Sequence, residues 1–237
     1  MHDDVSFLAE IAATIRYPSN VRPICADIAG PAFFPGGTGV VKDGLAARNI
    51  KRGGVLVLGH NFGNEKDYEA VKRHGSEFDT NATWRQLRPL LSDGGIAIDD
   101  CFFSNVLMGA MNSETSIGSI DEHRDALFRE DCATLLKATI DLQLPTVIVV
   151  LGLFALRFVG EKLEPLSSWR KIASYRAVDT SIDGPIREMS YGGRRVLAVA
   201  LVHPSFGHLN RKSRKFSGHQ GKDAEVAMLR IALARAR

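Results

Sequence analysis

The sequence predicts an α/β protein in which three layers, α/β/α, are built around a central four-stranded parallel sheet. Four short runs are rich in apolar, β-branched residues and nearly continuous, as expected for strands covered on both faces. They are residues 55–58, 100–105, 146–151 and 195–202. Helical patterns lie between these runs, and strands that alternate with helices form parallel sheets through right-handed crossovers. The 237 residues are 45% hydrophobic, which suits one domain over residues 1–237.

The other elements follow from periodicity and capping residues. A first helix is expected over residues 4–16, with Asp3 or Asp4 as its N-cap. Residues 17–50 hold several prolines and the run Gly36-Gly37-Thr38-Gly39, which lacks the Walker lysine and the Rossmann spacing. This segment is therefore predicted to be a long surface loop. Further helices are predicted at residues 83–91, 122–142, 152–159 and about 223–234, and residues 161–193 receive no assignment.

Charge, cysteine and hydropathy patterns exclude several classes of protein. The net charge of +3 is only mildly basic, so the position of the charges matters more than their sum. Cys25, Cys101 and Cys132 are too irregularly spaced for a disulfide framework or a zinc site. The sequence has no apolar run of the ~18 residues that a membrane helix needs, and its acidic N-terminus does not resemble a signal peptide. We therefore expect a monomeric protein of the bacterial cytoplasm or nucleoid, without membrane association, metal or cofactor.

Polar side chains follow three of the four predicted strands. The first strand leads into Gly59-His60-Asn61-Phe62-Gly63-Asn64, the second ends in Ser104-Asn105, and the fourth leads into His203-Pro204-Ser205. The third strand ends in Gly152, which offers no functional group. In an open parallel sheet, ligands bind beyond the carboxyl ends of the strands, so a binding site is predicted there.

These strand ends resemble the motifs of the uracil-DNA glycosylase superfamily. The run 59–63 is similar to the first motif, G-x-N-P-G, and the run 203–205 is similar to the second, H-P-S. Residues 84–91, 101–109 and 149–155 resemble the intervening segments, so the resemblance covers about residues 53–215. It implies a DNA-repair glycosylase that flips a damaged base out of DNA and hydrolyses its N-glycosidic bond. The iron–sulfur branch needs four cysteines, and this chain has three.

The resemblance implies catalytic roles for Asn61 and His203. Asn61 matches the residue that positions the attacking water; an amide accepts a hydrogen bond but does not take a proton, so a slow enzyme is expected. His203 matches the residue that donates a hydrogen bond to the base oxygen on which negative charge develops. Two structural alternatives stay open: Asn61 as the N-cap of the following helix, and His203 as a satisfied histidine at a strand end.

Base recognition is assigned in the same way. Asn105 matches the residue whose amide complements N3–H and O4 of uracil, and Phe78 is our choice for the aromatic platform, with Phe62 as its competitor. A turn asparagine and core phenylalanines are the structural alternatives. Gly59 and Gly63 border the base, and Gly63 stands where the most uracil-selective branch has a tyrosine. The resemblance thus implies room for 5-substituted uracil, mismatched thymine or hypoxanthine, although Phe62 replaces the usual proline.

Residues 206–221 form a basic segment that directly follows the H-P-S turn. The resemblance implies that Leu209 enters the minor groove, that Ser205 contacts a phosphate and that a cationic cluster grips further phosphates. The cluster consists of Arg211, Lys212, Arg214 and Lys215. A solvated basic loop is the alternative, and His60 is a further candidate for contact with a phosphate or the water.

Three functions are therefore compared. The preferred one is a monofunctional DNA glycosylase whose partner is DNA containing a damaged base, uracil above all. The alternative is a catalytically weak or inactive DNA-binding protein on the same fold. A small-molecule hydrolase of α/β type needs a nucleophile with a base, and the sequence has no G-x-S-x-G motif.

Overall fold

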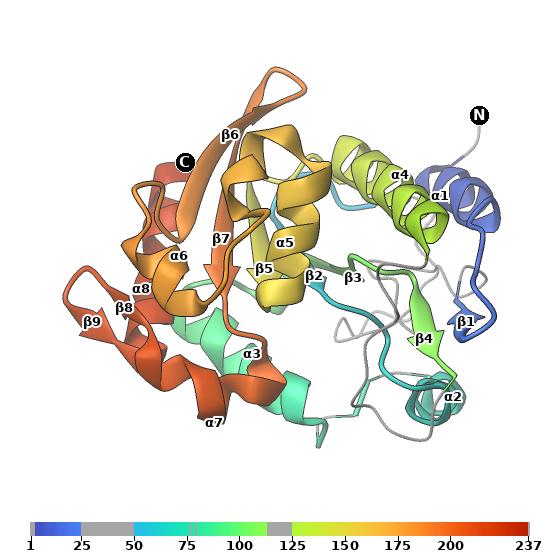
Figure 1. The fold of residues 1–237 in the computed structure, drawn as a ribbon, viewed down its shortest axis with the longest axis horizontal. Coiled ribbons are helices and arrows are strands. Elements are labelled where there is room, and N and C mark those ends of the chain that lie inside the picture. Colours follow the sequence, from blue (N-terminus) through green and yellow to red (C-terminus); the bar gives the residue numbers. More distant parts are fainter. Residues whose placement is uncertain (1–2, 25–49, 76, 79, 113–124, 237) are drawn as a thin grey trace. The chain divides into compact units, whose positions relative to one another are not determined.

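The computed structural model describes residues 3–24, 50–75, 77–78, 80–112 and 125–236. Figure 1 shows the helices and strands of these residues. The chain divides into two compact units. The first contains Met1–Arg52, His60–Glu77 and Phe102–Leu144, and the second contains Gly53–Gly59, Phe78–Cys101 and Pro145–Arg237. The expected single domain over residues 1–237 stays a prediction.

A five-stranded sheet has the order β3-β2-β5-β7-β6. Its strands are β2 (Val55–Gly59), β3 (Cys101–Asn105), β5 (Val147–Leu151), β6 (Ile186–Tyr191) and β7 (Arg194–Leu201). Strand β5 pairs in parallel with β2 and with β7, whereas β6 pairs antiparallel with β7. The prediction of an α/β fold with a largely parallel sheet is confirmed, but the four-stranded, all-parallel sheet is corrected by the antiparallel edge strand β6.

Burial along the strands explains why the central ones were predictable. Every residue of β2 and of β5 is buried, as expected for strands covered by helices on both faces. In the second unit, α5 (Leu153–Lys162) and α8 (Gly221–Ala236) both pack against the sheet, α5 in front of β5 and α8 behind β7 in Figure 1. Helix α3 (Ala82–Asp93) packs on α8. By contrast, only Ile186 and Met189 are buried in β6, which lies at the edge of the sheet.

The first unit is organised by helices α1 (Asp4–Ala13) and α4 (Ala126–Gln143), which pack together (Figure 1). The Arg16 guanidinium donates to both carboxylate oxygens of Asp131, at 2.8 and 2.6 Å. Strands β1 (Val21–Pro23) and β4 (Gly109–Met111) form an antiparallel pair, and α2 (Glu65–His74) contacts β4. Gly109 permits this pairing, since a Cβ there would lie 2.3 Å from Val21 Cγ1.

Several predicted elements occur with shifted ends, and others were not predicted. Asp3 caps α1, as expected, because its carboxylate accepts a hydrogen bond from Ser6 N at 2.7 Å. The predicted loop 17–50 contains β1, while its run 36–39 and Cys25 lie outside the described residues, as do residues 122–124. The unassigned segment 161–193 contains η4 (Glu164–Trp169), α6 (Tyr175–Thr180) and β6. Among the described residues, none of the helices has the length and apolar character needed to span a bilayer.

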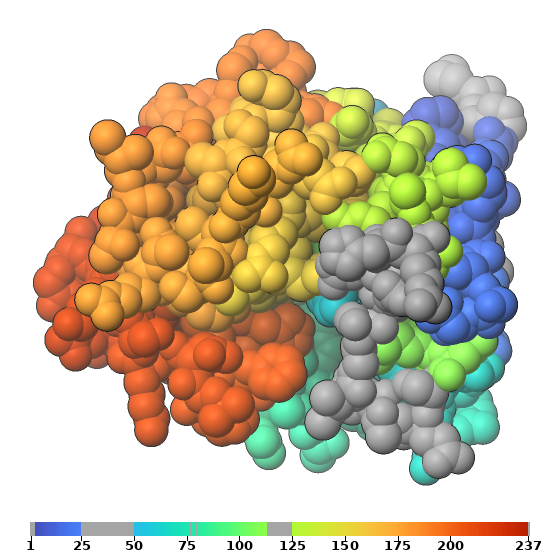
Figure 2. All heavy atoms as spheres, viewed as in Figure 1, coloured from blue at the N-terminus to red at the C-terminus, as the bar shows by residue number. Residues whose placement is uncertain are grey.

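The chain after β7 is a series of short elements. They are η5 (Pro204–Phe206), α7 (Gly207–Asn210), η6 (Arg211–Ser213), β8 (Lys215–Phe216) and β9 (His219–Gln220). A further short helix, η3 (Ile98–Asp100), lies elsewhere in the chain, just before β3. In the space-filling view, the orange-red atoms of this series lie at the surface of the second unit (Figure 2). Several residues of the basic segment expected to contact DNA are exposed, among them Leu209, Lys212 and Lys215, whereas Arg214 is buried.

Candidate active site

The first motif lies beside the segment that follows β3, within the first unit. Three backbone hydrogen bonds join the two segments: Leu107 N to His60 O (2.9 Å), Phe62 N to Gly109 O (3.1 Å) and Met111 N to Gly63 O (2.8 Å). A bridge between Asn64 and Met111 continues the pairing. The chain bearing Asn61 thus runs alongside the chain that leaves Asn105 at the end of β3.

Asn61 is held in a tight turn, and it does not cap the following helix. Its Oδ1 accepts a hydrogen bond from Gly63 N at 3.0 Å. The cap of α2 is Asn64, whose Oδ1 accepts from Asp67 N at 2.8 Å and which is only 3% exposed. The structural alternative for Asn61 is therefore wrong. Its Nδ2 is buried and has no hydrogen-bond partner within the described residues, which leaves a polar group available to a ligand or a water.

Asn105 ends β3 and is partly accessible, in contrast to the buried residues before it. Its backbone oxygen accepts a hydrogen bond from Ser104 Oγ at 3.4 Å. The side-chain amide makes no hydrogen bond within the part of the chain that the structure describes. A partly buried amide with free donor and acceptor groups is what base recognition requires.

Phe62 is half-buried beside the first motif, and its ring packs edge-on against Tyr68 at a centroid distance of 6.2 Å. Tyr68 is itself covered by the Arg22 guanidinium, 5.8 Å from the ring centroid. Gly63 has a φ of 74°, and a Cβ built there would meet no heavy atom of the described residues within 4 Å. The described residues therefore leave the space beside Gly63 open, and the room for a 5-substituent on a bound base stays a prediction.

Phe78 belongs to the second unit and precedes α3. It is half-buried, and its backbone oxygen accepts a hydrogen bond from Asn81 N at 3.0 Å. Asn81 in turn caps α3, because its side chain accepts from Thr83 N at 2.8 Å. This cap fixes the chain just after Phe78. Gly59, the first glycine of the motif, is the buried last residue of β2.

His203 follows β7 in the second unit and has a neutral imidazole at physiological pH. Desolvation lowers the pKa of His203 to about 4, below the ordinary value of 6.5. Its Nδ1 lies 2.8 Å from Ser205 Oγ. When the serine hydroxyl donates to Nδ1, the proton of the neutral ring resides on Nε2. The side chain then presents one N–H donor. A neutral donor of this kind stabilises an oxyanion by a hydrogen bond, without passing its proton to the oxygen.

Gly152 lies directly against His203, although the sequence indicated no role for it. A Cβ at position 152 would lie 3.2 Å from His203 Cβ, and the φ of Gly152 is 94°. Both facts favour glycine: a side chain would press on His203, and L-residues with a side chain rarely adopt this positive φ. Gly152 N also donates to Leu201 O at 2.9 Å, which ties the end of β5 to that of β7. Gly152 is thus part of the support of the histidine.

Gly152→Ala is expected to lower the rate of base release by about tenfold or more, because the added methyl group displaces His203. It should also lower the free energy of unfolding by about 1–3 kcal/mol through backbone strain. Gly184→Ala is the matched control, since Gly184 has a φ of 66° but open space around its Cβ position. The two variants should lose similar stability, and only Gly152→Ala should lose activity at saturating substrate. Equal activity in both would contradict the role of Gly152.

The basic segment presents apolar and cationic side chains together. Leu209 is 64% exposed and Phe206 is 49% exposed, and both rank among the few large hydrophobic side chains at the described surface. Lys212 and Lys215 are exposed, and Ser205 is half-buried beside His203. The exposed Leu209 is followed by two exposed lysines, and the expected contacts of these residues with DNA stay predictions.

Arg211 and Arg214 do not match the expected phosphate contacts. The Arg214 side chain is fully buried; its Nη2 donates to Ala200 O at 2.8 Å and lies 3.0 Å from Asp179 Oδ1. Arg211 Nε donates to Glu225 Oε2 at 2.7 Å, and the Arg211 side chain is 14% exposed. Their guanidinium groups are thus engaged by protein carboxylates rather than presented to DNA. A run of cationic residues is usually solvated, so residues 211–215 did not by themselves indicate these buried partners.

The comparison with protein families identifies the superfamily of this chain. A model of the uracil DNA glycosylase superfamily matches residues 49–226, which is well over half of the 237 residues. The chain belongs to this superfamily. No curated protein matches the sequence significantly. The matched range contains both motifs, the Asn105 strand end and the basic segment, so every site residue predicted above lies within the part that defines a uracil DNA glycosylase superfamily member.

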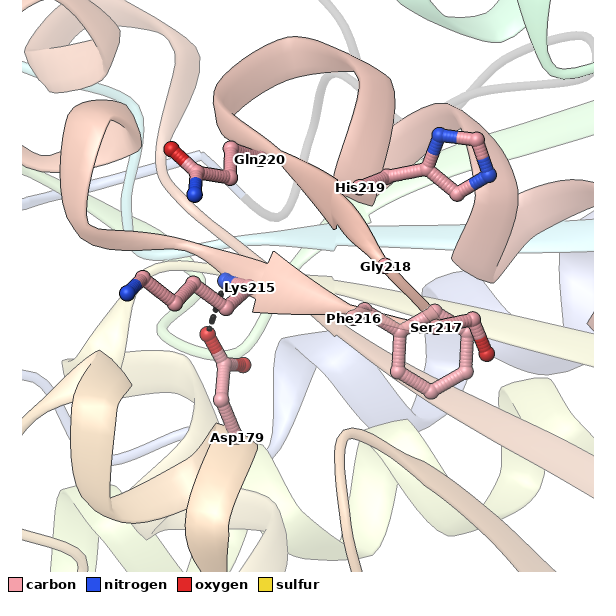
Figure 3. Close-up of a pocket in the computed structure, with 7 residues that line it drawn as sticks. All are labelled: Asp179, Lys215, Phe216, Ser217, Gly218, His219 and Gln220. Carbon is pink, nitrogen blue, oxygen red and sulfur yellow. Dashed lines mark hydrogen bonds between the residues drawn. The ribbon is translucent and has the colours of Figure 1, made fainter.

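In this superfamily member, the basic segment ends in a small hairpin formed by β8 and β9. Figure 3 shows Asp179 beneath the hairpin, where its Oδ2 accepts a hydrogen bond from Lys215 N at 2.9 Å. This bond uses the backbone of Lys215, so its ammonium group stays in solvent. The hollow between them is lined by residues 179 and 215–220. The hairpin therefore presents Lys215 from a fixed backbone.

Proposed function

We propose that this chain is a monofunctional DNA N-glycosylase that removes a deaminated base, above all uracil, from DNA. The observation that carries the proposal is His203: a desolvated, neutral imidazole with its Nδ1 on Ser205, at a strand end matching the second motif. A neutral donor is suited to an oxygen that gains negative charge in the transition state. Superfamily membership supports the same activity.

The reaction follows from the chemistry of the N-glycosidic bond. The bond between C1′ and the base breaks, and its electron pair leaves with the base, while the sugar becomes oxocarbenium-like. His203 donates a hydrogen bond to the base oxygen that carries the charge. Asn61 orients a water whose oxygen bonds to C1′, and the proton of this water passes to solvent, since an amide does not accept it. Asn105 reads the edge of the base, which should exclude cytosine because its donor and acceptor pattern is reversed.

The direct test is release of free base from duplexes that carry one uracil, mismatched thymine, hypoxanthine or xanthine. Wild type should release uracil, detected by mass spectrometry, and should cut the strand only after alkali treatment. The open space beside Gly63 predicts measurable release of a 5-substituted uracil as well. DNA binding that weakens with salt but gives no base release from any duplex would instead support an inactive DNA-binding protein.

The pH dependence should be flat over a wide range. The pKa of His203 is lowered to about 4, so the neutral donor persists from about pH 5 to pH 9, and Asn61 has no ionisable group. We expect a constant single-turnover rate over this range. Stability should decrease below about pH 6.5, because the unfolded state then binds a proton that the folded imidazole does not accept until pH 4. A rate that follows an apparent pKa near 6.5 would contradict a desolvated His203.

Phe78→Ala is expected to lower kcat/KM by about tenfold, because stacking on an aromatic ring contributes about 1–3 kcal/mol per base. Phe62→Ala is the paired variant: it removes a ring that packs on Tyr68, so mainly stability should decrease. Single-turnover kinetics and thermal unfolding of both variants separate the two roles. The reverse pattern, with activity lost in Phe62→Ala alone, assigns the platform to Phe62.

A further inference from the structure

A buried carboxylate on α8 joins two points of the chain that lie nine residues apart. Glu225 is fully buried. Its Oε1 accepts a hydrogen bond from Val202 N at 2.6 Å, and its Oε2 accepts from Arg211 Nε at 2.7 Å. Both of its oxygens are therefore engaged, one by the backbone and one by a guanidinium group.

The two partners of Glu225 bracket the loop of residues 203–210. Val202 immediately precedes His203, and Arg211 immediately follows α7. The loop between them carries Ser205 and the exposed Leu209. One side chain thus fixes both ends of the segment that holds His203, the proposed anion-stabilising donor, and Leu209, which is expected to enter the minor groove.

The loop also packs on the side chain that Glu225 holds. A Cβ at Gly207 would lie 2.6 Å from Gln86 Oε1 and 3.1 Å from Arg211 Cζ, so the backbone rests closely on the Arg211 guanidinium. Arg211 Nη1 lies 3.4 Å from Gln86 Oε1 on α3. Displacing Arg211 would therefore remove the surface on which the middle of the loop rests.

Arg214 lies beside the Glu225–Arg211 ion pair and contacts two carboxylates, those of Glu225 and Asp179. Arg214 Nη1 lies 3.8 Å from Glu225 Oε1, and its Nη2 lies 3.0 Å from Asp179 Oδ1. Two carboxylates and two guanidinium groups thus form one buried cluster without net charge. Buried ion pairs contribute little to stability on average, because desolvation offsets their attraction. Their value in this cluster is better explained by the geometry that they impose on the loop.

We propose that Glu225 is a positioning residue that holds both ends of the loop 203–210 in the geometry needed for base release. The proposal rests on the function proposed above, and it assigns a different task to each carboxylate oxygen of Glu225. The Oε1 contact with Val202 N orients His203, whereas the Oε2 contact with Arg211 orients the end of the loop that bears Leu209. A preformed loop loses less conformational freedom when it binds DNA.

Because the two oxygens of Glu225 have different tasks, three variants should differ in whether kcat or KM changes. Glu225→Ala removes both contacts and should lower kcat by about 10²-fold, because His203 is displaced. Glu225→Gln keeps an oxygen for Val202 N but loses the charge that holds Arg211, and Arg211→Met removes the same contact from the other side. Both should keep kcat within about threefold of wild type. Both should raise KM for DNA by about tenfold, because one charge-assisted hydrogen bond that positions the loop is lost. Glu188→Gln is the matched control, since Glu188 pairs with Arg195 and Arg235 at the surface.

Amide hydrogen exchange tests the loop independently of catalysis. In Glu225→Ala, the amides of residues 202–210 should exchange about tenfold faster than in wild type, while those of β5 stay protected. If Glu225→Ala does not fold, Glu225→Gln and Arg211→Met carry the test, with faster exchange confined to residues 207–211. Unchanged exchange, or a loss of thermal stability without any change in kcat or KM, would overturn the proposal. Because exchange needs no substrate, the role of Glu225 is decided even if wild type releases no base.

Discussion

His203→Ala is expected to lower the single-turnover rate of base release by about 10²–10³-fold, the usual effect of removing one donor to a developing oxyanion. The side chain is desolvated and its Nδ1 lies 2.8 Å from Ser205 Oγ. When the serine hydroxyl donates to Nδ1, Nε2–H is the one donor of the neutral ring. Burial strengthens such a hydrogen bond because water does not compete for the oxyanion. The loss should appear in kcat, measured with DNA in excess of KM.

His208→Ala is the matched control for this variant, because His208 is an exposed histidine of the same loop. It should keep the rate within about threefold of wild type, as surface substitutions usually have small effects. Thermal unfolding of both variants excludes a general loss of structure. Similar rates for His203→Ala and wild type would show that base release does not depend on this imidazole.

Asn61→Ala should lower the same rate by about 10²-fold, because the water is no longer oriented toward C1′. Oδ1 of Asn61 already accepts from Gly63 N, and a carbonyl oxygen has a second lone pair for the water. The buried Nδ2 of Asn61 lacks a hydrogen-bond partner among the described residues. An asparagine that served packing alone would not need this unpaired polar group, so we expect it to bind a ligand or a water. The rate is measured by quenched-flow or manual sampling of free base under single-turnover conditions.

Asn64→Ala is the control, since it removes the asparagine that caps α2 three residues further along. It should cost about 1 kcal/mol of stability, as loss of an N-cap does, without a comparable loss of rate. The two substitutions remove the same side chain from neighbouring turns, so their comparison separates chemistry from folding. A variant pair in which Asn61→Ala loses stability and keeps its rate would assign Asn61 a structural role.

The central strands were predictable because their short, nearly continuous apolar runs are rich in β-branched residues and are typical of strands covered on both faces. The edge strand β6 was not, because only Ile186 and Met189 of its six residues are buried, which is neither a continuous apolar run nor the alternation of a half-buried strand. Helix α2 was missed for a similar reason: of its ten residues, mostly charged, only Tyr68 and Val71 are buried. Marginal amphipathic elements depend on the partner that they pack against, and a sequence does not specify that partner.

The site divides in the same way. Residues at strand ends could be chosen as candidates, since ligands bind beyond the carboxyl ends of parallel strands, and their roles stay predictions. Gly152 and Glu225 could not, because their importance depends on neighbours distant in sequence. One signal was nonetheless present: Glu225 lies in the buried stripe of α8 together with Ala224, Met228 and Leu229, where a carboxylate needs a partner. Arg211 and Arg214, assigned to DNA from their charge, are among its partners.

The most direct test is a crystal structure of the whole chain bound to duplex DNA that contains 2′-fluoro-2′-deoxyuridine, whose glycosidic bond resists hydrolysis. The account predicts one extrahelical uracil with its edge on the Asn105 amide, a base oxygen within hydrogen-bond distance of His203 Nε2, and a water on Asn61 Oδ1 facing C1′. A uracil that remains stacked in the duplex, or one bound away from these three side chains, would contradict it.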